Sequence, residues 1–421
     1  MWKEPPHQPL PHHGNGHGRR AAALGTIVLS FVVAFEIAIM ISPFAVVFYA
    51  AFNPVLLALD RWSLTRWLTA FFLPHMIVPP DPLLVALRVL GSVLFVAGGV
   101  AFLACALQVY LGKWLTRGTA TRGLYVVIRH PQYLALAVAA LGLVIMWPRF
   151  LTLALFAVML FLYYLLARDE ERRMAARHGE QYLQYMRTTG RFVPRRVEEW
   201  LGLASTAPSP PRVATSLGLL FGILVIVIGS GFVARAYTIR HLPLSPTGAV
   251  DVIGITADDV QAARSLLPDV LQDAEVRRAL SAASQPGHRI LAYVVPIDYT
   301  MQGMIADTGE EWKLFGQHKT IAMITEYVLH PFAHLTEGHA HGGGMAPAPS
   351  LHDSPAMKRR IIFIDVWAEG RALEGPRDDF AIDVRRRPLL FADVHLHTGE
   401  VLQVRPTPPG TGWGRVPTPM F

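Results

Sequence analysis

Long apolar stretches alternate with short charged segments over the first half of the chain. Five stretches approach or exceed the roughly twenty apolar residues that a helix needs to cross a bilayer. They are Ala21–Phe52, Leu83–Gly112, Gln132–Trp147, Phe150–Ala167 and Val213–Ala234. Only Pro148 and Arg149 separate the third stretch from the fourth, so we expect a tight helical hairpin there. The pattern predicts a polytopic helical membrane core of about five transmembrane helices.

The last 170 or so residues follow a different pattern. Thr256–Asp259 has the form of a helix N-cap with an acidic first turn, and helical material continues to about Ala283. Four strand-like apolar runs follow. They lie at Arg289–Asp298, Arg360–Trp367, Leu389–Leu396 and Val401–Arg405. The predicted fold class is therefore mainly α, with a soluble α+β domain outside the membrane after the helical core.

Composition supports this division. Hydrophobic residues make up 52% of the chain and charged residues 16%, with a mean hydropathy of +0.34, as in membrane proteins. Breaks rich in Pro, Gly and His set the predicted boundaries. They give a disordered tail at 1–20, a membrane core at 21–203, a linker at 204–212, a fifth transmembrane helix at 213–236 and the α+β domain at 249–421.

Arginines cluster beside the apolar spans, which is typical of cytoplasmic loops. With Arg19 and Arg20 inside, five crossings of the inner membrane leave the N-terminus cytoplasmic and the C-terminal domain extracytoplasmic. The formal net charge of +7 then reflects contact with lipid headgroups. Because no basic groove with interleaved aromatic residues is present, nucleic acid is not an expected partner. Cys105 is the only cysteine, which excludes disulfides within the chain.

Polar motifs occupy the predicted cytoplasmic ends of neighbouring spans. RHPQY at Arg129–Tyr133 precedes the third span, and DEERR at Asp169–Arg173 follows the fourth. HGEQYLQYMRTTGRFVPR follows at His178–Arg195. Charged groups beside hydrocarbon need partners or a bound polar ligand. A mixed basic and acidic cluster at that depth suits a zwitterionic cofactor with a cationic sulfur.

The segment Gly123–Pro194 resembles the isoprenylcysteine carboxyl methyltransferase and phospholipid methyltransferase superfamily of integral-membrane methyltransferases. The matching positions are Gly123, Tyr125, Arg129, His130, Pro131, Tyr133, Glu170, Glu171, Gly179, Tyr182, Tyr185, Phe192 and Pro194. The resemblance implies that S-adenosylmethionine is bound by Arg129, His130, Tyr133, Glu170, Glu171, Tyr182 and Tyr185. It also implies catalytic positions for Arg129, Glu170 and Glu171. The implied acceptor is a lipophilic molecule that enters from the bilayer: a prenylcysteine carboxylate, a phospholipid amine or a small thiol.

The side-chain chemistry agrees with these roles. A guanidinium such as that of Arg129 can bind the cofactor's carboxylate in a bidentate way. Side chains of adjacent helical residues point about 100° apart, so Glu170 and Glu171 seldom serve one atom. One is expected to contact the cofactor or orient a basic residue while the other pairs with an arginine. The alternative is a solvated acidic turn paired with Arg172 and Arg173.

Histidines of the C-terminal domain form a second candidate site. His330 and His334 are spaced i, i+4, and His339 and His341 follow on a glycine-rich segment. Imidazoles at this spacing could bind a zinc or copper ion, although surface histidines in a polar loop would give the same pattern.

A non-enzymatic reading stays open beside the methyltransferase. Ala135 stands where many relatives have glycine, and both the fifth span and the appended domain exceed the minimal family pattern. These features would also fit a methyltransferase-like scaffold, whose histidine-rich outer domain docks onto other subunits of a membrane complex or binds metal.

Overall fold

The computed structural model describes residues 55–75, 81–116, 123–202, 204, 213–247, 250–283, 285–297, 299, 305–306 and 357–407. The predicted first span, Ala21–Phe52, lies outside these residues. The chain divides into two compact units. The helical unit contains Leu87–Trp147 and Thr152–Ser230. The sheet unit contains Pro148–Leu151 and Gly231–Phe421. The described residues from 55 to 86 also belong to the sheet unit.

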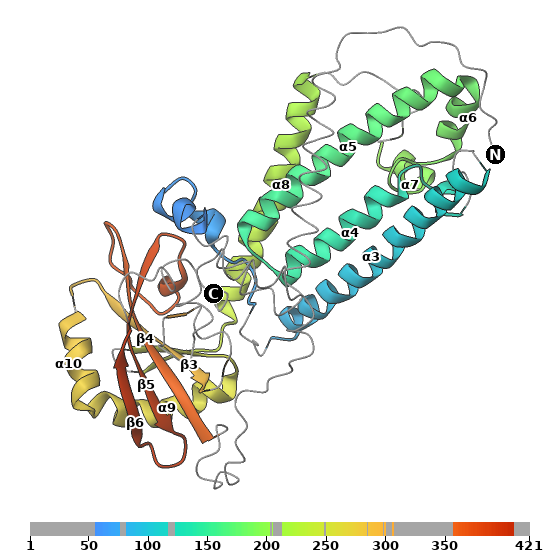
Figure 1. The fold of residues 1–421 in the computed structure, drawn as a ribbon. Coiled ribbons are helices and arrows are strands. Elements are labelled where there is room, and N and C mark those ends of the chain that lie inside the picture. Colours follow the sequence, from blue (N-terminus) through green and yellow to red (C-terminus); the bar gives the residue numbers. More distant parts are fainter. Residues whose placement is uncertain are drawn as a thin grey trace, which may run out of the picture. The chain divides into compact units, whose positions relative to one another are not determined.

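Four long apolar helices dominate the first half of the described chain (Figure 1). They are α3 at Pro82–Thr116, α4 at Pro131–Met146, α5 at Phe150–His178 and α8 at Val213–Arg240. Three segments among the described residues are long and apolar enough to cross a membrane: Pro82–Val109, Phe150–His178 and Ala214–Arg240. Helix α4 is equally apolar but has only 16 residues, or about 24 Å. Three of the five predicted spans are therefore confirmed as helices that are long and apolar enough to cross a membrane.

Helices α3 and α4 approach each other closely through small residues. A Cβ atom added to Gly98 would lie 2.4 Å from the backbone nitrogen of Ala139 and 2.7 Å from the carbonyl oxygen of Ala135. Gly142 of α4 faces the backbone of α3 in the same way, at Phe95 and Gly91. Small residues let membrane helices approach closely enough for dispersion contacts between backbones. Ala135 is thus buried against α3.

Residues 55–75 brace the turn between α4 and α5 within the sheet unit. The amide of Phe72 donates to the carbonyl of Pro148 at 2.8 Å, and the amide of Phe150 donates to that of Ala70 at 3.0 Å. The Arg149 guanidinium also donates to the carbonyl of Thr69. This segment includes an α-helical stretch at residues 55–61 and a short 3-10 helix, η1 at Arg66–Thr69. The hairpin predicted at Pro148 and Arg149 is confirmed, and its turn is fixed by backbone pairing.

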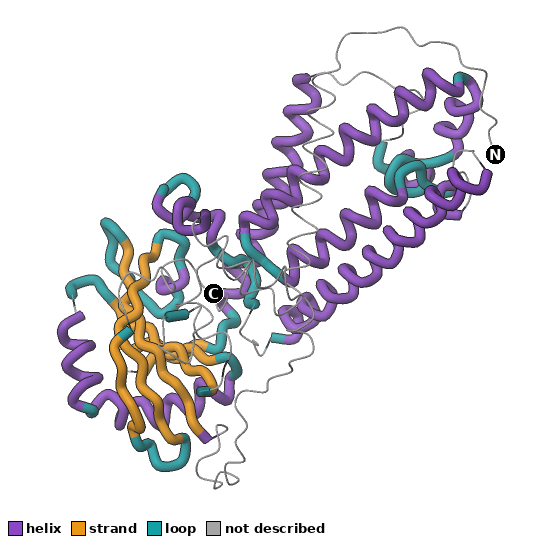
Figure 2. Tube along the Cα trace, in the orientation of Figure 1, coloured by secondary structure: helices purple, strands orange, loops and turns teal. Residues whose placement is uncertain are grey.

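Within the described residues, the sheet unit contains six strands in sequence order (Figures 1 and 2). They are β1 at Leu244–Thr247, β2 at Val250–Gly254, β3 at Arg289–Pro296, β4 at Lys358–Ala368, β5 at Val384–His395 and β6 at Val401–Pro406. All neighbours are antiparallel except β2 and β3, which are parallel. A parallel pair needs a crossover connection. Helices α9 at Ala257–Gln272 and α10 at Ala274–Ala283 provide it and pack on the sheet.

The predicted helix after Thr256 is present but broken. Thr256 and Asp259 form a reciprocal capping box that starts α9. The helix ends at Gln272, and the carboxylate of Asp273 then accepts hydrogen bonds from the amides of Glu275 and Val276. The side chain of Asp273 therefore starts a second helix. The predicted C-terminal domain is confirmed as a separate sheet-containing domain.

Candidate active site

A short backbone pairing positions the RHPQY motif at the start of α4. The Arg129 amide donates to the carbonyl of Gly190 at 2.7 Å, and the His130 amide donates to that of Arg191 at 3.0 Å. Pro131 occupies the first turn of α4, where its missing N–H has no cost. Gly190 has no room for a side chain, because an added Cβ would lie 1.8 Å from the carbonyl oxygen of Val193. The chain after α6 (Glu180–Thr188) is thereby joined to the start of α4.

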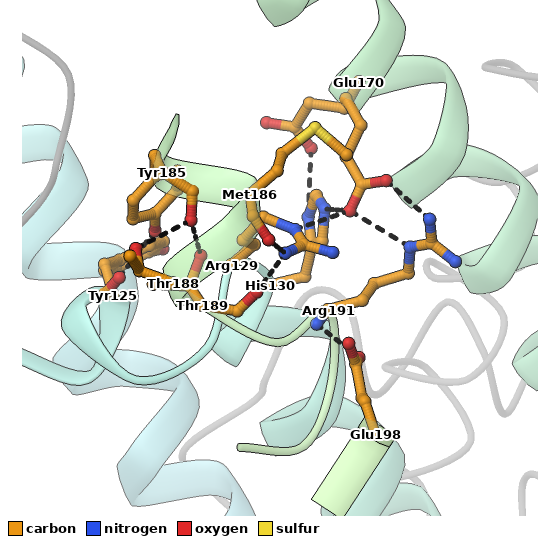
Figure 3. A network of polar contacts seen from close by, with 11 residues as sticks. Tyr125, Arg129, His130, Glu170, Tyr185, Met186, Thr188, Thr189, Arg191 and Glu198 are labelled. Carbon is orange, nitrogen blue, oxygen red and sulfur yellow. Dashed lines mark hydrogen bonds and ion pairs between the residues drawn. The ribbon is translucent and has the colours of Figure 1, made fainter. Parts of the chain in front are cut away.

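Figure 3 shows a polar network that includes Arg129, His130 and Arg191. Glu171 of α5 is the acceptor that two of these residues, Arg129 and Arg191, share. Its Oε1 accepts hydrogen bonds from the Nε atoms of Arg129, at 2.8 Å, and Arg191, at 3.0 Å. Its Oε2 accepts a third from Nη2 of Arg191 at 2.6 Å. The His130 imidazole lies 3.4 Å from the same carboxylate. Because Glu171 is fully buried, two guanidinium groups compensate one buried carboxylate.

The guanidinium of Arg129 makes hydrogen bonds through Nε and Nη1, whereas its Nη2 makes none within the described residues. Its Nη1 donates to the carbonyl of Met186 at 3.0 Å and also to that of Thr189. Its Nη2 is buried and has no hydrogen-bond partner among the described residues, although the side chain is only 1% exposed. A buried guanidinium N–H without a partner carries a large desolvation cost. An anionic ligand atom would satisfy it.

Glu170 differs from its neighbour in exposure. Its side chain is 47% exposed, against 1% for Glu171, and its nearest ionic neighbour is Nδ1 of His130 at 3.6 Å. The His130 ring stacks on Tyr133, with centroids 5.5 Å apart, and Tyr133 stacks on Tyr163 at 5.1 Å. The site thus combines a half-exposed carboxylate, an imidazole and a column of aromatic rings.

Tyr182 and Tyr185 lie on α6, with ring centroids 5.8 Å apart. The Tyr185 hydroxyl donates to the carbonyl of Tyr125 at 2.5 Å, which links α6 to the segment before the RHPQY motif. Burial raises the pKa of Tyr185 to about 12 and raises that of Tyr182 as well. Both phenols are therefore neutral at physiological pH. Tyr182 is 4% exposed and belongs to the packed wall of the site.

Sequence reasoning overlooked two residues of this network. The first is Arg191, whose guanidinium forms an ion pair with Glu171. Burial lowers the pKa of Arg191, but its hydrogen bonds to Glu171 outweigh this effect and the net shift is upward. Glu198, on α7 at Arg195–Trp200, accepts from the Arg191 amide and is 5% exposed. The charge of Arg191 was visible in the sequence, but no signal identified Glu198.

The predicted metal ligands His330, His334, His339 and His341 lie outside the described residues. Within the described part of the chain, no group of three or more His, Cys, Asp or Glu side chains is placed to hold a metal ion. The zinc or copper site therefore stays a prediction.

The comparison with known families agrees with this geometry. Residues 86–181 match the phospholipid methyltransferase family. This segment is therefore similar to the integral-membrane methyltransferases of that family. The matched range contains Arg129, His130, Tyr133 and both glutamates, and it ends just before Tyr182. No curated protein and no solved structure matches the chain. The family match and the apolar helices together suggest a membrane protein that contains a methyltransferase-like segment.

Proposed function

We propose that the helical unit is an S-adenosylmethionine-dependent methyltransferase that acts on a lipid acceptor. The observation that carries this proposal is the buried Nη2 of Arg129, which has no partner among the described residues. It lies in a guanidinium already oriented by Glu171, Met186 and Thr189. Such a preorganised donor fits the carboxylate of an amino-acid-like cofactor.

Different parts of the site would hold different parts of the cofactor. S-adenosylmethionine would supply a methyl group already activated on a cationic sulfur. Arg129 would bind the cofactor's carboxylate, while the half-exposed Glu170 would offer its oxygens to the cationic part. The stacked rings of His130, Tyr133 and Tyr163 present flat apolar surface for the base. Glu171 acts as a positioning residue, since Arg129 and Arg191 occupy both its oxygens.

The family match supports a phospholipid amine as the acceptor over a prenylcysteine carboxylate or a small thiol. An amine attacks only in its neutral form, so a base must accept its proton. Glu170 is the better placed of the two adjacent glutamates, because its carboxylate is half exposed and has no guanidinium bound to it among the described residues. Alignment of the acceptor with the methyl group would contribute most of the rate acceleration.

We further propose the predicted orientation in the inner membrane, with the Arg129–Glu171 site at the cytoplasmic face and the sheet unit outside. Arginine-rich segments beside the site support this. The test needs a background without cysteine, and Cys105, which is 2% exposed, is the only one to replace. In a Cys105→Ser background, a membrane-impermeant maleimide should label Arg278→Cys in intact cells and label Arg187→Cys only after permeabilisation. The reverse pattern would overturn the orientation.

Titration of the purified chain with S-adenosylmethionine tests the activity. Saturable binding is expected in the parent and should be lost in Arg129→Ala and Glu170→Ala. Arg187→Ala, an exposed change on α6, serves as the matched control and should bind normally. Membrane extracts incubated with an isotope-labelled methyl donor should then show label in phospholipid by mass spectrometry. Absence of binding in the parent would favour the scaffold function instead.

A further inference from the structure

A cavity of about 320 Å³ lies in the sheet unit, next to the end of helix α8. One wall comes from the end of α8 and the strand after it, with Arg240, Leu242 and Pro246. The other wall is the loop before the short helix η7 (Asp378–Phe380), with Arg377 and Asp378. The lining therefore combines two cations, one carboxylate and several apolar side chains.

Two membrane spans place this cavity at the level of lipid headgroups. The candidate span in α8 ends at Arg240, and the one in α3 begins at Pro82. These ends meet, because the Tyr237 hydroxyl donates to Oδ2 of Asp81 at 2.9 Å. The Tyr237 ring also stacks on His241, with centroids 4.2 Å apart. Aromatic and polar residues are typical of the boundary between hydrocarbon and water.

The two arginines of the cavity are available to a ligand. Both are exposed, and neither makes a hydrogen bond or an ion pair through its side chain within the described residues. Oδ2 of Asp378 accepts hydrogen bonds from the amides of Glu374 and Gly375, at 2.9 and 3.2 Å. The carboxylate therefore shapes the loop, and no hydrogen bond or ion pair within the described residues ties it to either guanidinium. A net positive lining at the membrane surface attracts anions.

We propose that this cavity binds the headgroup of an anionic phospholipid from the leaflet beside the sheet unit. Arg240 and Arg377 would share the lipid phosphate through charge-assisted hydrogen bonds. Leu242 and Ile239 would contact the start of the acyl chains, which continue along the apolar surface of α8. The Arg129 site lies in the other unit, so this lipid is a bound ligand and not the methyl acceptor, and the inference does not depend on methyltransferase activity.

Short-chain phosphatidylglycerol, titrated into delipidated full-length protein in neutral detergent, tests the proposal. Each basic residue near a membrane surface strengthens anion binding about fivefold, so Arg240→Gln with Arg377→Gln should weaken affinity roughly 25-fold. Arg277→Gln, an exposed change on α10, is the matched control and should have no effect. Lysine at both positions should retain most of the affinity.

Three results would overturn the proposal. The first is unchanged affinity in the double variant, and the second is an equal loss in Arg277→Gln. The third is competition by inorganic phosphate at the concentration at which the lipid binds, because the cavity would then be a phosphate site without lipid selectivity. Should the double variant fail to fold, Arg377→Gln alone lies outside the apolar spans and should still weaken binding about fivefold.

Discussion

The Nε atom of Arg129 donates a hydrogen bond to Oε1 of Glu171 at 2.8 Å, although 42 positions separate the two residues. Both side chains are 1% exposed. This pair joins the start of α4 to the C-terminal part of α5, and Arg191 adds the chain after α6 to the same carboxylate. A single carboxylate thus sets the position of three segments that surround the candidate active site.

Glu171→Gln should therefore damage both stability and cofactor binding. Removing one member of a buried ion pair costs about 3–5 kcal/mol, because the remaining charge is left without compensation. We expect the free energy of unfolding to fall by about 3 kcal/mol or more. The dissociation constant for S-adenosylmethionine should rise roughly tenfold or more, which corresponds to 1.4 kcal/mol. Thermal unfolding in detergent and equilibrium binding measure the two effects.

Glu180→Gln is the control for this change. Glu180 lies on α6, is 71% exposed and forms an ion pair with the exposed Arg187. Exposed ion pairs contribute about 0–1 kcal/mol, so both measurements should stay near the parent values. If Glu171→Gln were as mild as Glu180→Gln, Glu171 would not hold the site together.

The motifs allowed the meeting of Arg129, His130, Glu170 and Glu171 to be predicted, because their order along the chain matches the family pattern. Which of the two glutamates is buried against the arginines, and which stays half exposed, could not be predicted. It depends on which side of α5 faces Arg129 and Arg191, and this follows from helix packing rather than from adjacent sequence positions. Glu198 was missed because a carboxylate that accepts from a backbone amide leaves no pattern in the sequence.

In the sheet unit, the runs predicted as strands became β3 to β6, but β1 and β2 were missed. Strand β1 has the sequence LSPT, and a proline within it argues against a strand except at an edge, where β1 lies. Strand β2 has only five residues, including the buried Asp251. Its parallel partner β3 begins 35 residues further on, so no local hairpin signal marks the pairing.

The close approach of α3 and α4 gives a second prediction. Gly98→Ala would place a methyl group 2.4 Å from the backbone nitrogen of Ala139 and should separate the helices. Overpacking of this kind costs about 1–3 kcal/mol. Gly99→Ala is a matched control in the next position, because no atom lies within 4 Å of its added Cβ. Thermal unfolding in one detergent should show a loss for Gly98→Ala and little change for Gly99→Ala; equal effects would exclude tight packing at Gly98.

The pH dependence of the sheet unit gives the third prediction. Asp379 is fully buried, and the Arg289 guanidinium bridges it to Asp251. Burial and the negative charge of Asp251 raise the pKa of Asp379 from 3.8 to about 8, although Arg289 and Arg386 oppose the shift. Between these two values the folded chain binds a proton that the unfolded chain releases. Stability from this group is therefore greatest near pH 4 and is lost as the pH rises through about 8.

Asp379→Asn should remove this dependence, since an amide does not ionise. Hydrogen exchange of peptides from β4 and β5, measured in the full chain, should show the parent losing stability relative to Asp379→Asn as the pH rises from 6 to about 9. Asp383→Asn is the control. The hydrogen bond from Arg371 lowers the pKa of Asp383, so that carboxylate stays ionised throughout this interval and its replacement should leave the slope unchanged. Parallel pH profiles for the parent and Asp379→Asn would mean that Asp379 is already ionised in the folded chain at pH 6.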